Sequence, residues 1–107
     1  MPELTQNPSL SELQTYVESL CKERSWDQTP VLETFLLFTE EVGELAKAIR
    51  NKRKLHTEKG KVSNSFELAD ELADVLSYLL ELANKFDIDL EQAFRKKEEI
   101  NAGRSWS

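Results

Sequence analysis

The sequence is poor in cysteine, in positive charge and in long apolar runs. Its single cysteine, Cys21, excludes an intrachain disulfide and favours a reducing cytosol. The net charge of −6 argues against a general nucleic-acid or anionic-membrane binder, because such proteins usually carry a basic surface. No apolar run approaches the ~20 residues that cross a bilayer, and the first four residues do not begin a signal peptide. We therefore expect a cytoplasmic protein.

Basic residues are absent from two acidic stretches, residues 33–44 and 67–81. Within them Glu41 and Glu44, and likewise Glu71 and Asp74, are three positions apart and would share one face of a helix. Carboxylates this close repel each other, and burial adds a desolvation cost unless a cation lies between them. Oxygen-only ligands suit Mg²⁺, with Mn²⁺ as a possible substitute. The four acids are therefore candidate metal ligands.

The remaining pattern predicts an all-α fold of four helices. All four helix starts carry a capping sequence: Ser9 with Glu12, Thr29 followed by Pro30, Asn64 with Glu67, and Asp89 with Gln92. The third helix begins at Ser65, after a basic connection over residues 51–64 that is long for a helical bundle. The predicted helices are residues 9–24, 30–50, 65–86 and 89–101, with residues 104–107 as a short tail.

The chain is long enough for one domain with a modest core. Apolar residues make up 39% and charged residues 32%, so a compact monomer would be only marginally stable and an oligomer is attractive. The helix over residues 30–50 is apolar on most sides, which predicts burial on most sides. Glu41 and Glu44 would then lie in a cleft between helices.

Simpler interpretations remain for each candidate residue. The acidic groups could be solvated helix faces, although such faces usually mix acids with bases. Glu40 is either surface decoration or a base beside the metal, and Trp26 is either a core plug or a stacking surface for a nucleobase. Three residues near the end could form a solvated helix terminus or a phosphate clamp: Lys97, Asn101 and Arg104.

Taken together, these residues resemble the MazG-type all-α nucleoside triphosphate pyrophosphohydrolases, in particular the small single-domain branch that is dCTP pyrophosphatase-like. The most specific part is E-E-V-G-E-L at residues 40–45 followed by E-L-A-D-V-L-S-Y-L at residues 71–79. R-S-W-D-Q at residues 24–28 and the terminal Lys97, Asn101 and Arg104 support it. The sequence departs at Pro30, near where the dCTP-preferring branch often carries histidine or an aromatic residue, so the resemblance leaves the preferred base open.

The resemblance implies one MazG-like domain over residues 1–107, a four- to five-helix bundle assembled as a homodimer or homotetramer. It implies hydrolysis of a deoxynucleoside triphosphate to the monophosphate and pyrophosphate, as house-cleaning of non-standard or excess pyrimidine deoxynucleotides. Glu41, Glu44, Glu71 and Asp74 would hold Mg²⁺, with Glu40 or Glu41 as the proton acceptor. The substrate-binding residues would be Trp26, Lys97, Asn101 and Arg104.

Two other functions fit the same acidic groups. One is a non-catalytic helical interaction module whose acidic faces bind a basic partner; its binding would weaken with salt. The other is a divalent-metal carrier without turnover. Stabilisation by Mg²⁺ separates the interaction module from the metal-binding alternatives, and turnover separates the carrier from the enzyme.

Overall fold

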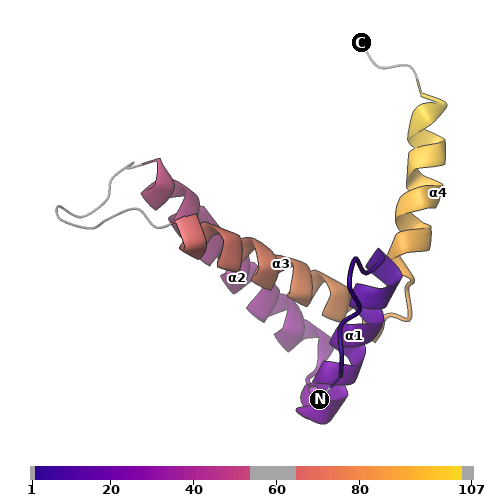
Figure 1. The fold of residues 1–107 in the computed structure, drawn as a ribbon, viewed down its shortest axis with the longest axis horizontal. Coiled ribbons are helices and arrows are strands. Elements are labelled where there is room, and N and C mark those ends of the chain that lie inside the picture. The colour runs from indigo at the N-terminus through magenta and orange to yellow at the C-terminus, as the bar shows by residue number, and fades with distance from the viewer. Residues whose placement is uncertain (1, 54–64, 105–107) are drawn as a thin grey trace. The chain divides into compact units, whose positions relative to one another are not determined.

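A computed structural model describes residues 2–53 and 65–104, and within these ranges the chain is helical without a strand (Figure 1). The all-α prediction is therefore confirmed for the described residues. Residues 54–64, which include most of the predicted basic connection and the predicted cap Asn64, and residues 105–107 of the predicted tail lie outside them. The elements are α1 Leu10–Glu23, the 3₁₀ turn η1 Trp26–Gln28, α2 Val31–Lys52, α3 Ser65–Lys85 and α4 Leu90–Ala102.

Local capping chemistry explains two of the helix starts and corrects a third. Ser9 and Glu12 form the predicted capping box of α1, and the Asp89 side chain accepts from the Gln92 amide at the start of α4. The prediction that Thr29 caps the second helix was wrong. Pro30 holds the N-cap position in an extended conformation, with φ −59° and ψ 147°, and Thr29 instead closes the preceding turn.

The chain divides into two compact units, which we describe separately. One comprises residues 1–29 and 80–107, and the other residues 30–79. Helix α3 is continuous through the boundary. The single domain expected over residues 1–107 stays a prediction.

A small apolar core organises the first unit. Val17 and Cys21 of α1 and Leu80 of α3 are buried in one cluster, with Leu80 only 2% exposed. Partly buried side chains pack around this cluster: Leu10, Leu13, Tyr16 and Leu90. The predicted apolar side of the first helix is therefore the side that packs.

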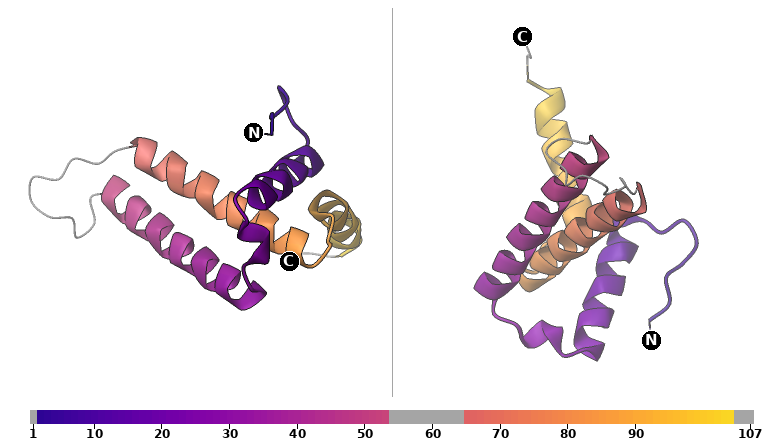
Figure 2. Two further views of the ribbon diagram at one scale, coloured as in Figure 1. Left: turned by 90° about the horizontal axis from the view of Figure 1, so that it is seen from below. Right: turned by 90° about the vertical axis from the view of Figure 1, so that its left-hand side faces the viewer.

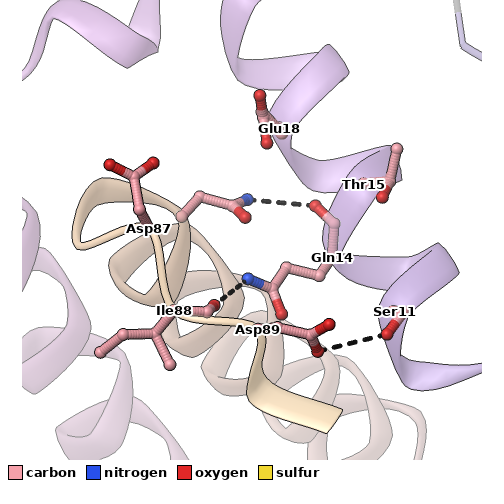
Figure 3. A pocket seen from close by; sticks show the side chains of 8 residues that line it. Ser11, Gln14, Thr15, Glu18, Asp87, Ile88 and Asp89 are labelled. Carbon is pink, nitrogen blue, oxygen red and sulfur yellow. Dashed lines mark hydrogen bonds between the residues drawn. The ribbon is translucent and has the colours of Figure 1, made fainter. Parts of the chain in front are cut away.

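Buried Gln14 ties α1 to the connection between α3 and α4 (Figure 3). Its amide nitrogen donates to the Ile88 carbonyl, and its amide oxygen accepts from the Leu90 amide at 3.0 Å. The Asn84 side chain in turn donates to the Gln14 carbonyl at 3.0 Å. A polar cavity of about 250 Å³ opens beside these bonds, with Ser11 and Asp89 on its wall. One glutamine thus satisfies the first backbone donor of α4, which has no partner within that helix.

The second unit is an antiparallel pair made by α2 and the first part of α3, which lie side by side in all views (Figures 1 and 2). Thr34 and Ala48 of α2 are buried. Most of the apolar residues on these helices are instead exposed, because a two-helix layer covers only one stripe of each helix. The prediction that α2 is buried on most sides is wrong within one chain: Leu32 is 69% exposed and Leu36 is 57% exposed. No helix of the described residues combines the length and apolarity that a bilayer crossing requires.

Replacing Gln14 with methionine should lower the free energy of unfolding by about 2 kcal/mol, because the Ile88 carbonyl and the Leu90 amide lose their side-chain partner. Urea denaturation followed by circular dichroism measures the change. Gln92→Met, at an exposed position of α4, is the control and should stay within about 0.5 kcal/mol of wild type. Equal midpoints for the two variants would show that Gln14 does not hold this connection.

Candidate metal site

Three carboxylates converge in the second unit, where α2 and α3 lie side by side. Glu41 comes from α2, and Glu71 and Asp74 come from α3. Each offers one oxygen, and these oxygens lie within 4.8 Å of one another. Glu71 and Asp74 share a helix face through their three-residue spacing, and the antiparallel neighbour brings Glu41 to the same place.

The electrostatics of this group are unfavourable for three free carboxylates. Burial is the largest cause that raises the pKa of Glu41, followed by its hydrogen bond with Glu71 and by the charges of Asp74, Glu71 and Glu40. A carboxyl whose pKa is higher in the folded than in the unfolded chain costs stability as the pH rises through the folded value. The folded protein therefore loses stability at this point once the pH exceeds the raised pKa of Glu41.

One oxygen of the group also lacks a partner. Glu71 Oε2 is buried and accepts no hydrogen bond from the residues that the structure describes, and an acceptor left in this state carries a desolvation cost. An all-oxygen donor set with an unsatisfied oxygen and excess negative charge fits a hard divalent cation such as Mg²⁺ or Mn²⁺. We conclude that the three residues are suited to hold one.

The other two acids predicted for the site are placed differently. Glu44 lies one turn after Glu41 on α2, is exposed, and is not part of the three-carboxylate group. Glu40 is exposed as well, and its charge helps to raise the pKa of Glu41. The roles of both in metal binding or proton transfer stay predictions.

Trp26 lies in the first unit on the turn η1 and is 47% exposed. The alternative that it plugs the core is therefore wrong for the described structure. The guanidinium carbon of Arg24 lies 4.9 Å from the ring centroid, a cation–π distance. With Arg24 on one side, the indole still has open surface for another planar group.

The C-terminal candidates also belong to the first unit. Lys97 and Asn101 are four residues apart on α4, so they share a face, and Lys97 is exposed. The Asn101 side chain donates to Glu98 at 3.4 Å. Arg104 lies beyond the helix, which ends at Ala102, and its amide donates to the Asn101 carbonyl at 3.1 Å. Of the three candidates, only Lys97 and Asn101 therefore share a face of α4.

Besides Gln14, two buried polar side chains were missed from the sequence. Thr34 is fully buried, its hydroxyl has no hydrogen-bond partner within the part of the chain that the structure describes, and it precedes Glu41 by seven residues on the same side of α2. Glu81 is 8% exposed and forms a hydrogen bond with Cys21. Two spacings in the sequence could have indicated these residues: the seven positions between Thr34 and Glu41, and the four positions between Glu81 and Lys85.

Comparison with known proteins decides the family. The MazG nucleotide pyrophosphohydrolase domain matches residues 30–101. The chain belongs to this family. The match contains the three clustered carboxylates of the MazG domain together with Lys97 and Asn101, whereas Trp26 and Arg104 fall outside it.

A curated relative is similar over most of the chain. The dCTP pyrophosphatase 1 of Mus musculus is 34% identical over 102 residues, which cover 91% of this chain and 59% of the mouse protein. This MazG chain thus spans about three-fifths of the length of that relative.

Glu71→Gln should raise the melting temperature in EDTA, because it removes one of the repelling charges. The same variant should lose most of the Mg²⁺-dependent rise, which for the wild type we expect at about 5 °C or more near saturation. Differential scanning fluorimetry with EDTA and with Mg²⁺ measures both effects.

Asp70→Asn is the matched control, since Asp70 is exposed on the same helix and is not in the group. It should keep the Mg²⁺-dependent rise. A wild-type response to Mg²⁺ in Glu71→Gln would remove Glu71 from the metal site.

Proposed function

We propose that this chain is a Mg²⁺-dependent nucleoside triphosphate pyrophosphohydrolase that converts a deoxynucleoside triphosphate and water into the monophosphate and pyrophosphate. The observation that carries the proposal is the convergence of Glu41, Glu71 and Asp74. Membership of the MazG nucleotide pyrophosphohydrolase family supports it. In this proposal Glu44 is a fourth ligand, and Mn²⁺ can replace Mg²⁺.

The proposed chemistry is an in-line displacement at the α-phosphorus. Water forms a new bond to this phosphorus, the bond to the α–β bridging oxygen breaks, and pyrophosphate leaves with that oxygen. Glu41 accepts the proton of the water, a role that suits a carboxyl whose pKa is raised by burial and neighbouring charge. Glu40 is the alternative acceptor. When bound, Mg²⁺ supplies positive charge against the triphosphate and acidifies water.

Substrate recognition is assigned to the first unit. In the proposal the exposed indole of Trp26 stacks on the base, while Lys97, Asn101 and Arg104 contact phosphate or sugar. The name of the mouse relative supports a pyrimidine deoxynucleotide as substrate. We propose that the biological role is the removal of excess or non-standard pyrimidine deoxynucleotides in the cytoplasm.

We also propose that the chain assembles as a homodimer or homotetramer through the second unit. The exposed apolar residues of α2 include Phe35, Val42 and Ile49, which recur every seven residues and therefore form one stripe. Leu72, Leu76 and Leu79 form a corresponding stripe on α3, each between 39% and 52% exposed. Apolar stripes of this extent are typical of surfaces that pack against another copy.

Purified protein supplied with Mg²⁺ should release pyrophosphate from deoxynucleoside triphosphates, most rapidly from pyrimidine nucleotides. Asp74→Ala should reduce kcat/KM by about a hundredfold or more, because one carboxylate of the metal group is lost. Asp70→Asn should retain wild-type activity. Chromatographic product analysis distinguishes pyrophosphate from orthophosphate.

The absence of turnover with every nucleoside triphosphate would refute the enzymatic function. Salt-sensitive binding of a basic partner without any Mg²⁺ effect would then favour the interaction module. A Mg²⁺-dependent rise in melting temperature without turnover would favour the metal carrier instead.

Leu79→Glu should dissociate the oligomer, since burying an unpaired carboxylate in an apolar interface costs roughly several kcal/mol. Size-exclusion chromatography with light scattering should show a dimer or tetramer for the wild type and a monomer for the variant. Leu4→Glu, at a position 49% exposed in the first unit, is the control and should leave the mass unchanged. A wild-type monomer would refute the proposed assembly.

A further inference from the structure

The turn that carries Trp26 has little internal support. Its hydrogen bond runs from the Thr29 amide to the Trp26 carbonyl at 3.0 Å, and Ser25 enters the turn in a left-handed conformation with φ 60°. No side-chain cap is made by Ser25. A three-residue 3₁₀ turn of this kind needs outside contacts to hold one conformation.

Lys85, the last residue of α3, supplies such contacts. Its ammonium donates to the Thr29 carbonyl at 2.7 Å and approaches the Asp27 carbonyl at 3.4 Å. Both oxygens lie at the C-terminal end of the turn, where backbone carbonyls lack partners and a cation is favourable. All of these residues belong to the first unit.

Two buried residues, Glu81 and Cys21, lie near the ammonium of Lys85. Glu81 lies one turn earlier on α3, and the charge of Lys85 lowers its pKa against the larger effect of burial, which raises it. The Cys21 thiol donates a hydrogen bond to Glu81, and burial followed by the charge of Glu81 raises the thiol pKa to about 11. Cys21, Glu81 and Lys85 line one cavity of about 290 Å³ beside the turn. Lys85 thus interacts electrostatically with a buried acid and donates hydrogen bonds to the turn.

We propose that Lys85 is a positioning residue for Trp26: by binding the carbonyls of Asp27 and Thr29, it fixes the turn that presents the indole to the nucleobase. This inference rests on the proposed function, in which Trp26 stacks on the base. Nearly half of the indole surface is exposed, so packing constrains the ring only in part, and the backbone of the turn also sets its place. Arg24 then covers one side of the ring.

The experiment uses a Trp106→Phe background, which leaves Trp26 as the sole tryptophan. In this background Lys85→Met should lower the fluorescence anisotropy of Trp26 and increase its quenching by acrylamide. It should also raise KM for the preferred deoxynucleotide by about tenfold, the effect of one charged hydrogen bond, while kcat stays within about twofold. Lys85→Arg, which keeps a donor, should restore most of both properties.

Lys22→Met is the matched control. Lys22 lines the same cavity, but its ammonium pairs with Glu18 at 2.9 Å and, unlike that of Lys85, has no hydrogen bond to the described carbonyls of the turn. It should leave the anisotropy, the quenching and KM at wild-type values.

Unchanged Trp26 fluorescence in Lys85→Met would overturn the inference, as would an equal response to Lys22→Met. A fluorescence change with unchanged KM would also overturn it, because the turn would then have no part in substrate binding. If the wild-type protein turns over no nucleotide, the proposed function fails. The fluorescence arm, which needs no substrate, then still decides whether Lys85 holds the turn.

Discussion

The mutual repulsion of three carboxylates is the constraint on which the functional interpretation depends. Glu41, Glu71 and Asp74 each place one oxygen within 4.8 Å of the others, and a buried oxygen of Glu71 has no hydrogen-bond partner among the described residues. The pairing of α2 with α3 keeps these groups together, although burial, then the hydrogen bond with Glu71, and then the neighbouring charges raise the pKa of Glu41. A fold that tolerates such a cost is best explained by a ligand of opposite charge.

The two units use polar groups in opposite ways. In the first unit, Gln14 and Lys85 satisfy carbonyls and amides at the ends of helices and turns, so their polar atoms stabilise the connections. In the second unit, the buried hydroxyl of Thr34 on α2 and a buried oxygen of Glu71 on α3 have no partner among residues 2–53 and 65–104. Hydrogen-bonded polar groups therefore stabilise the connections of the first unit, whereas the buried polar atoms without a partner lie in the second unit, which contains the candidate metal site.

Local signals in the sequence were sufficient to predict the helices and three of the four acids expected at the metal site, Glu44 being outside the group. The Ser9 and Asp89 caps act within one turn, and the spacing of Glu71 and Asp74 fixes their common face. Contacts between segments far apart could not be read in this way. The bond from Lys85 to Thr29 spans 56 residues, and no periodicity encodes it. The exposure of Leu36 was mispredicted because apolar periodicity does not tell whether a face packs within one chain or against another.

The environment of Cys21 has a practical consequence for handling the protein. With a pKa of about 11, the thiol is almost entirely protonated near neutrality, with roughly one molecule in ten thousand as thiolate. Alkylating reagents and mild oxidants act on the thiolate, so this buried sulfur should resist both. A cysteine introduced at an exposed position can therefore be labelled selectively without first removing the native one.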